Sequence, residues 1–327
     1  MKKLFLAAVL ALLPAFACAQ PAAQPQENVR IETPVAAQAE GPARPPLPGA
    51  DRDADPALWV IRDADTTIYL FGTIHLLDGR TWFNDEVKTA FDASRELVLE
   101  ARIPEDPAAF AAGMMQQARD TTGRTISSRL TPAQNAALNR LLARIGVPEG
   151  AFDRFEPWFV SLTLTAVLAQ EVGISGENGP ETILTAAARA RSMPIGELEG
   201  MAHQIGIFDR MPEALQVTQL IQTLDEFESA SEKLGPMLSA WSMGDVERLG
   251  TLTDESMGQD ADSRALYRII FTDRNAAWAG WIQRRLAQPG IVFIAVGAGH
   301  LAGNDSVQAV LRARGIQSAR VPHRVAR

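Results

Sequence analysis

Phe293-Ile-Ala-Val-Gly297-Ala-Gly-His300, near the end of the chain, repeats the pattern of Ile68-Tyr-Leu-Phe-Gly72-Thr-Ile-His75 near its start. Each stretch is an apolar, β-prone run followed by Gly-x-x-His. This pattern predicts a buried strand, a close turn at the glycine and a histidine at the strand's carboxyl end. Ligands of α/β sheets bind at that edge, so two imidazoles brought there predict a shared metal or acid–base site. The alternative is two glycine turns with hydrogen-bonded core histidines.

A carboxylate follows a third buried run, between the two histidine motifs. Glu96-Leu-Val-Leu-Glu100-Ala-Arg-Ile103 predicts a strand that Pro104 ends. A carboxylate in such a place is costly unless a cation, a metal ion or hydrogen-bond donors compensate it. Glu100 is therefore a candidate site residue. The alternative is that Glu100 faces solvent or pairs with Arg102 or another base.

The order of the predicted elements indicates the fold class. Residues 58–70 read as a β-hairpin, residues from Asp106 to Ala287 as mostly helical, and residues from Ile291 onward as strand, helix and strand. We therefore predict an α/β (α+β) fold with a central mixed sheet built from both ends of the chain and a large helical insert at about 105–287. Such a sheet places His75 and His300 at one edge.

Several elements of the insert are predicted individually. Thr131-Pro-Ala-Gln134 has the cap residue, proline and glutamine of a helix start. The remaining expected elements are helices over Phe155–Val172, Glu181–Ser192, Met211–Trp241 and Asp262–Leu286, and a short strand over Pro194–Glu199.

The first 50 residues are predicted to lie outside the folded domain. Residues 1–19 have the basic start, apolar centre and small-residue end of a secretory signal, and residues 20–50 form a Pro/Ala-rich flexible linker. The domain is expected over 51–327. Cleavage after Ala19 predicts a periplasmic or secreted protein. The alternative is a lipoprotein with a lipid anchor on Cys18.

Composition excludes some classes of protein. Cys18 is the one cysteine among the 327 residues, so the sequence excludes an intramolecular disulfide and a nucleophilic-cysteine enzyme in the mature fold. The formal charge is −8, and no Lys/Arg cluster stands out. Nucleic acid is therefore not an expected partner.

An ordered set of motifs resembles the TraB/GumN family, which includes the Tiki proteins. The two Gly-x-x-His motifs, Leu97-Val-Leu-Glu100, Glu197-Leu-Glu199 before Gln204, and Arg274-Asn275-x-x-Trp278 carry this resemblance over about residues 59–321. The resemblance implies a sheet core with helices and a metal-dependent hydrolase site, since Tiki members are metal-dependent proteases. The chain departs from the family at Gly179-Pro180-Glu181, where many members have Gly-x-Asp.

The resemblance also assigns roles. It implies that His75, His300 and Glu100 form the site, with Arg274 close by. We expect the two histidines to hold a divalent ion such as manganese, cobalt or zinc, and Glu100 to complete the site or to act as general base. Arg274 is expected to stabilise an anionic intermediate or to orient Glu100; the alternative is an ordinary ion-pairing arginine. Supporting positions behind these residues are Glu199 and Asn275.

Three classes of function remain open at this stage. The first is an exported metal-dependent hydrolase, peptidase-like and related to Tiki, that acts on a peptide, a protein or another envelope-associated substrate. The second is a non-catalytic binding or accessory protein for envelope polysaccharide. The third is a metal-binding or haem-binding protein.

Overall fold

A computed structural model describes residues 53–83, 85–227, 230–257 and 260–323. The predicted signal peptide, the linker and Cys18 lie outside these residues. Within them, no helix is both long and apolar enough to cross a bilayer.

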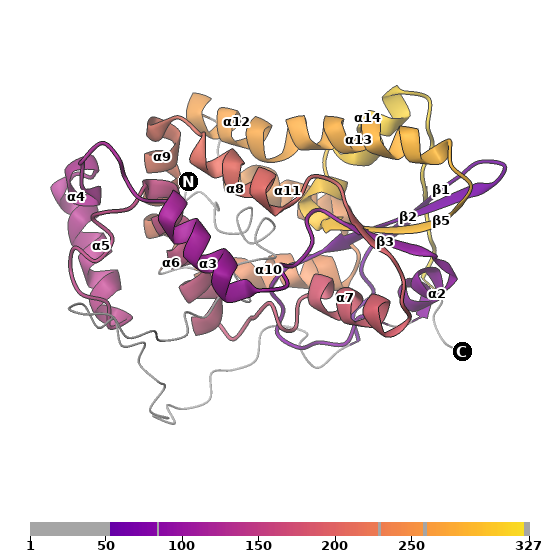
Figure 1. Cartoon of the computed structure of the whole chain (residues 1–327), viewed down its shortest axis with the longest axis horizontal. Helices are drawn as coiled ribbons and strands as arrows, with labels where there is room; N and C mark the ends of the chain where they lie inside the picture. The colour runs from indigo at the N-terminus through magenta and orange to yellow at the C-terminus, as the bar shows by residue number, and fades with distance from the viewer. Residues whose placement is uncertain (1–52, 84, 228–229, 258–259, 324–327) are drawn as a thin grey trace.

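Six strands form one mixed sheet, which confirms the predicted fold class (Figure 1). The order across the sheet is β4-β3-β5-β2-β1-β6. β2 pairs antiparallel with β1 and parallel with β5, and β3 lies parallel between β5 and β4. The strands are β1 (Leu58–Arg62), β2 (Thr66–Thr73), β3 (Glu96–Leu99), β4 (Ile195–Glu197), β5 (Gly290–Gly297) and β6 (Ala319–Arg320).

Both ends of the chain supply this sheet, as predicted, but the insert also contributes one edge. β4 comes from the middle of the helical region and pairs with β3 through Leu97 and Ile195. The outer edge of the sheet at that side is therefore a three-residue strand between helices.

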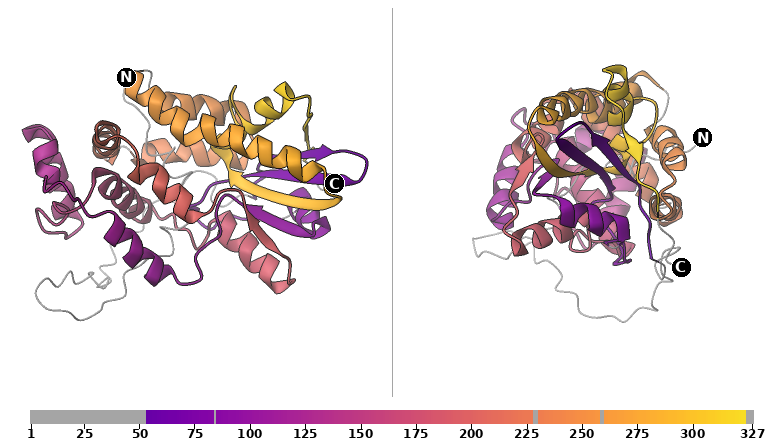
Figure 2. Two further views of the ribbon diagram at one scale, coloured as in Figure 1. Left: turned by 45° about the horizontal axis from the view of Figure 1, so that its top comes forward. Right: turned by 90° about the vertical axis from the view of Figure 1, so that its right-hand side faces the viewer.

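Helices cover the sheet on both faces because its strands are apolar on both sides. One face, with Ile68 and Ile294, packs on α13 (Asp273–Leu286) and α14 (Val307–Ala313). The opposite face, with Phe71 and Phe293, packs in a second and larger cluster, to which three further helices contribute side chains among others. These are α2 (Asp85–Ala93), α7 (Pro180–Ala190) and α10 (Ala230–Ser242). Figure 2 shows the sheet between these layers.

The remaining helices lie mainly beyond the carboxyl ends of the parallel strands (Figure 1). They are α3 (Pro107–Gln117), α4 (Ile126–Arg129), α5 (Pro132–Arg144), α6 (Pro157–Glu171), α8 (Met201–Asp209), α9 (Glu213–Glu226), α11 (Val246–Met257) and α12 (Ala261–Tyr267). Two further turns are the π-helical η3 (Arg268–Thr272) and the 3-10 turn η4 (Ala298–Leu301).

The structure corrects some of the predicted boundaries. β3 ends at Leu99 rather than Ile103, so Glu100 follows the strand instead of lying within it. The stretch 211–241 is two helices, and the stretch 262–286 contains the π turn η3 between α12 and α13. The capping box of Thr131 and Gln134 at the start of α5 is confirmed.

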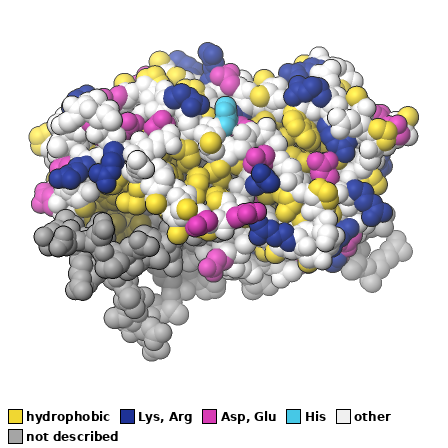
Figure 3. All heavy atoms as spheres, viewed as in Figure 1, with side chains coloured by type: hydrophobic (Ala, Val, Ile, Leu, Met, Phe, Trp, Pro, Cys, Tyr) yellow, Lys and Arg dark blue, Asp and Glu magenta, His cyan; other side chains and the backbone are white. Residues whose placement is uncertain are grey.

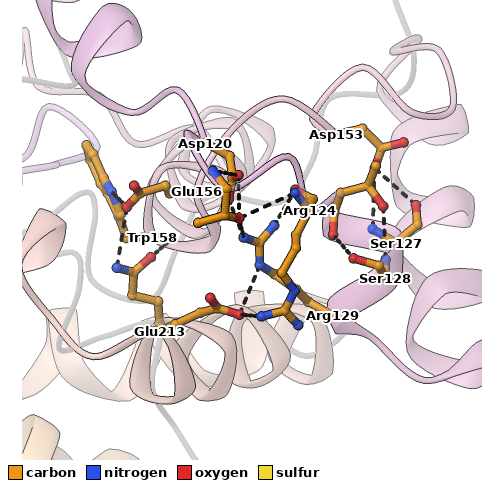
Figure 4. Close-up of polar contacts among 12 residues, drawn as sticks. Asp120, Arg124, Ser127, Ser128, Arg129, Asp153, Glu156, Trp158 and Glu213 are labelled. Atoms are coloured by element: carbon orange, nitrogen blue, oxygen red, sulfur yellow. Dashed lines mark hydrogen bonds and ion pairs between the residues drawn. The ribbon is translucent and has the colours of Figure 1, made fainter.

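A polar cluster joins the helices farthest from the sheet (Figure 4). Arg129 on α4 pairs with Asp120, and both side chains are almost fully buried. The same guanidinium reaches Glu213 on α9, with Nε 3.2 Å from the carboxylate. Thr122 donates its backbone N–H and its hydroxyl to Asp120, each at 2.7 Å. These contacts fix α4 against the start of α9.

Candidate functional site

The two Gly-x-x-His motifs leave the sheet side by side. β2 and β5 are parallel neighbours, and Thr73 pairs with Gly297 at their carboxyl ends. His75 and His300 follow these two residues closely, and both side chains are buried. The expectation that both histidines reach the same edge of the sheet is confirmed.

Gly72 has the close contact that its motif predicts. A Cβ atom at this position would lie 3.1 Å from Cα of Ala298, the first residue of η4. The carbonyl of Gly72 also accepts a hydrogen bond from the Trp241 indole at 2.8 Å. A larger residue would therefore push the end of β2 away from the turn that carries His300.

A buried carboxylate orients His75. Nδ1 of His75 lies 2.6 Å from Oε1 of Glu181. The Thr73 hydroxyl donates to the same oxygen. Glu181 is in the first turn of α7, where the helix dipole favours an acid. A Cβ atom on Gly179 would lie 2.1 Å from the His75 carbonyl oxygen, so glycine is required for α7 to approach His75 this closely.

The environment of Glu181 favours its ionised form. Burial alone would raise the pKa of the carboxyl, but the positive charge of His75 and the hydrogen bonds from His75 and Thr73 outweigh burial and lower it. Glu181 is therefore an anion that fixes the orientation of the imidazole. With Nδ1 directed at Glu181, Nε2 is the His75 nitrogen that would face a metal ion.

Three donors surround the Glu100 carboxylate. The Gly297 backbone N–H donates to Oε1 at 2.6 Å, while Gln204 at 3.0 Å and Arg274 at 2.6 Å donate to Oε2. The Arg102 guanidinium lies 3.8 Å from Glu197, so Glu100 pairs with another base, Arg274, as the second form of the alternative expected. Burial raises the pKa of Glu100, and the positive charges of Arg274 and His75 oppose that shift.

Arg274 is the centre of the polar contacts at this edge. Its guanidinium contacts Glu100, Glu199 and His300, and it lies over the ring of Trp278 with 4.7 Å between the guanidinium carbon and the ring centroid. Burial alone would lower the pKa of Arg274, but the charges of Glu100 and Glu199 outweigh burial and raise it. Arg274 therefore remains a cation between two carboxylates.

The π turn η3 helps to place Arg274. It precedes α13 directly, and its residue Ile270 accepts a hydrogen bond from Nη1 of Arg274 at 3.1 Å. π turns inside helices occur frequently at functional sites. Another η3 residue, Phe271, packs on His300 with 4.9 Å between ring centroids.

His300 is held as a neutral imidazole. Its Nδ1 lies 2.6 Å from the Asn275 side-chain oxygen, which only accepts hydrogen bonds. Nδ1 therefore carries the proton, and Nε2 accepts from Arg274 Nη1 at 3.0 Å. Burial lowers the pKa of His300 well below its usual value, and the charges of Arg274 and His75 act in the same direction.

The predicted ligands fit a divalent ion in their chemistry. His75, His300 and Glu100 offer the two imidazoles and one carboxylate that catalytic metal sites use. Both histidines have the orienting partners that ligand histidines usually have. Gln204 adds a buried amide oxygen that has no hydrogen-bond partner among the residues the structure describes.

The present arrangement is looser than a closed metal site. Among the described residues, the donor atoms of the three predicted ligands do not all lie within 4.8 Å of one another. His300 Nε2 lies 3.9 Å from Glu100 Oε1, and Arg274 contacts both residues. Within the described part of the chain, three other donor groups do lie within 4.8 Å of one another, those of Asp55, Asp85 and His323, and this group is largely exposed.

Sequence reasoning gave no role to two residues of this site. In the sequence, Glu181 stands out only as a departure from Gly-x-Asp, yet it is the partner of His75. Gln204 is part of a motif there, and in the structure it donates to both Glu100 and Glu199. For Glu181, the sequence signal is an acid in the first turn of a predicted helix, directly after a loop and Gly-Pro. The supporting residues Glu199 and Asn275 do contact Arg274 and His300.

This chain belongs to the TraB/PrgY/gumN family, whose family model matches residues 57–320. The chain is 27% identical over 187 residues to Uncharacterized protein YbaP of Escherichia coli K12. The aligned region covers 57% of this chain and 68% of that protein. It is also 25% identical over 288 residues to an uncharacterized protein of Treponema pallidum. Here the aligned region covers 83% of this chain and 85% of that protein. No solved structure matches significantly.

Proposed function

We propose that this protein is a metal-dependent hydrolase of the peptidase kind, with His75, His300 and Glu100 as the residues that hold a divalent ion. The observation that carries the proposal is the contact between His75 Nδ1 and the buried Glu181 carboxylate at 2.6 Å. A histidine so oriented, at a sheet edge shared with a second histidine and a buried carboxylate, has the support that ligand histidines need.

A bound divalent ion would polarise a substrate carbonyl and lower the pKa of a bound water. The chain's own residues would do the remaining work. Glu181 orients His75, and Asn275 keeps the proton of His300 on Nδ1. His300 would then offer Nε2 to the ion, for which Arg274 would have to give up its present contact with that nitrogen.

Arg274 and Glu100 have complementary roles in this proposal. Where Glu100 acts as general base instead of completing the ligand set, its pKa, raised by burial, suits it to accept a proton from an attacking water and to pass it to a leaving amine. Arg274 lies 2.6 Å from Glu100 and is a fixed cation. It would stabilise negative charge that develops on the substrate oxygen.

The test combines elemental analysis of the purified protein with cleavage of a peptide library. The wild-type protein is expected to retain about one divalent ion per chain and to lose activity when chelated. His75→Ala should lose both the ion and the activity. His203→Ala is the matched control, because His203 is an exposed histidine on α8. The proposal is overturned if His75→Ala keeps the wild-type metal content and cleavage rate.

We also propose that the protein acts outside the cytoplasmic membrane. The support is the signal-like pattern of residues 1–19 and the single cysteine, Cys18. Periplasmic or secreted location after cleavage is the first expectation, and a lipid anchor on Cys18 is the second. The substrate would then be a peptide, a protein or another component of the envelope.

One observation favours a second candidate, a binding or accessory protein of the envelope without turnover. Arg274 already compensates the charges of Glu100 and Glu199, so these carboxylates do not require an ion for stability. In that case the purified protein should hold no stoichiometric metal and should not cleave the peptide library. His75→Ala should then change ligand binding alone.

A further inference from the structure

A hollow opens beside the candidate site, between α3, α7 and α8. It has a volume of about 740 Å³. Its wall combines apolar side chains with polar and charged ones, and side chains of both kinds gather on this face of the molecule (Figure 3). The apolar side chains include Leu99, Phe110, Met114, Ile195 and Ile205. This size is within the range of about 300–1,000 Å³ that ligand pockets usually have.

Several residues that line the hollow are sequence neighbours of the polar residues of the site. Leu99 in its wall directly precedes Glu100, and Ile205 directly follows Gln204. Thr185 in its wall lies one helical turn after Glu181 on α7. A ligand in the hollow therefore lies against the same elements that carry the site.

The edge strand β4 forms one side of the hollow. In the parallel pair with β3, Leu97 N–H bonds to the Pro194 carbonyl at 3.0 Å and Leu198 N–H to the Leu99 carbonyl at 2.9 Å. Alternate residues of a parallel strand bond to a given neighbour. The peptide groups of Gly196 therefore face β3, and those of Ile195 and Glu197 face away from it.

Those outward peptide groups belong to residues that line the hollow. Ile195 and Glu197 are both in its wall, and β4 is the last strand in the sheet order on that side. Both residues are half-buried rather than covered. The hollow thus combines an apolar wall with a strand edge that offers backbone donors and acceptors, which is the arrangement for binding an extended peptide by strand addition.

We propose that an extended peptide binds alongside β4 as a further strand and places an apolar side chain in the hollow. Its backbone would bond to Ile195 and Glu197, and its chain would continue toward Glu199, which lies just after β4, and Glu100, which lies just after β3. This inference rests on the proposed function, for which it supplies the substrate class: peptides in extended form with a large apolar side chain beside the bond to be cleaved.

Gly113 on α3 offers a way to fill the hollow without disturbing the fold. It lines the hollow, and a Cβ atom at this position would meet nothing within 4 Å. Leucine is also a much better helix former than glycine. Gly113→Leu is therefore expected to fold and to occupy the space of the peptide side chain. Ala112→Leu is the matched control, since Ala112 is an exposed neighbour on the same helix.

The experiment measures binding of a fluorescent peptide, Ac-Ala-Leu-Val-Leu-Ala-Lys-NH2, to the full chain by anisotropy in the presence of a chelator. Two further peptides test the recognition: one with both leucines changed to serine, and one N-methylated at alternate residues to remove strand-pairing donors. We expect Gly113→Leu to weaken binding of the parent peptide at least tenfold and Ala112→Leu to leave it unchanged. Both altered peptides should bind wild-type protein at least tenfold more weakly.

Three outcomes would overturn the inference: no binding of the parent peptide to the wild-type protein, equal binding of the N-methylated peptide, or equal binding by Gly113→Leu. Equal binding of the N-methylated peptide would indicate an apolar site for a lipid chain instead. The measurement is independent of turnover. Peptide binding that meets every expectation without cleavage in added metal would contradict the proposed hydrolase and leave strand addition intact. If the peptide is cleaved at a rate that neither Gly113→Leu nor N-methylation changes, the proposed hydrolase is supported and strand addition is contradicted.

Discussion

Nδ1 of His75 lies 2.6 Å from Oε1 of Glu181, although the two residues are 106 positions apart in the chain. The contact joins the end of β2 to the first turn of α7 and is fully buried. It depends on Gly179, where a side chain would collide with the His75 carbonyl. The pair is therefore a long-range constraint that fixes which imidazole nitrogen faces Glu181.

The first prediction concerns Glu181→Gln. Glutamine has nearly the same shape, so the variant should fold, but its neutral amide no longer strengthens His75 as a ligand. We expect metal affinity to fall by about 10-fold to 100-fold. Titration calorimetry with manganese or zinc measures this change. Glu177→Gln in the preceding loop is the control, because Glu177 is exposed. Equal metal affinity in the two variants would remove Glu181 from any role in metal binding.

A second prediction concerns acid stability and the cluster of Figure 4. Burial alone would raise the pKa of Asp120, but the hydrogen bonds from Thr122 and Arg129 outweigh burial and lower it. Because the folded pKa lies below the unfolded one, Asp120 stabilises the fold above about pH 4. That contribution is lost as the pH falls through the folded pKa.

Asp120→Asn should therefore lower the melting temperature at neutral pH and reduce its dependence on pH in the acid range. Thermal unfolding between about pH 3 and pH 7 measures both effects. Asp153→Asn is the control, because Asp153 accepts its hydrogen bonds from the backbone N–H and the hydroxyl of Ser127 in the same cluster, both of which are uncharged donors. A parallel pH dependence for wild type and Asp120→Asn would show that the ion pair with Arg129 does not contribute to acid sensitivity.

The sheet was largely predictable from the sequence because its main strands are apolar on both faces. The runs that end at Gly72 and Gly297 are long enough to be recognised, and their likeness indicates neighbouring positions. The position of β4 was not predictable in the same way. A three-residue strand has little pattern of its own, and its place depends on pairing with β3 and on packing between α7 and α8.

The candidate site was predictable where a polar residue lies within three residues of the end of a buried strand. His75, His300 and Glu100 meet that condition. Arg274 was indicated by family resemblance, because one arginine on a long helix has no local signal of burial. The role of Glu181 could not be derived, since sequence shows that an acid begins a helix but not which strand end the helix faces. The tertiary contact between Gly179 and the His75 carbonyl determines that α7 faces the end of β2.

A third prediction follows from the start of the chain. If residues 1–19 are a signal peptide, fractionation should recover the protein from the periplasm, from the medium or, when Cys18 is acylated, from the membrane. A reductant should not change the melting temperature, because the one cysteine precludes a disulfide within the chain. Cytoplasmic recovery with residues 1–20 intact would contradict export.

The last prediction separates a metal ligand from an ion-pair partner at Glu100. Glu100 and Glu199 both contact the Arg274 guanidinium, and both are buried. Glu100→Gln and Glu199→Gln each remove one charge from this arginine and place an amide beside it. Both variants should therefore lose stability, by roughly 1–3 kcal/mol for a buried group left with a poorer partner. Chemical denaturation measures that loss.

Metal content is the measurement that distinguishes the two variants. Glu100→Gln should reduce metal affinity about 10-fold or more and abolish metal-stimulated hydrolysis, because an amide is a weaker ligand and does not accept a proton from water. Glu199→Gln should retain most of the metal, since the Glu199 carboxylate contacts Arg274, Gln204 and Trp278, none of which is a proposed ligand. If both variants keep full metal content and equal activity, Glu100 serves only to pair with Arg274, and the two histidines remain the only proposed ligands.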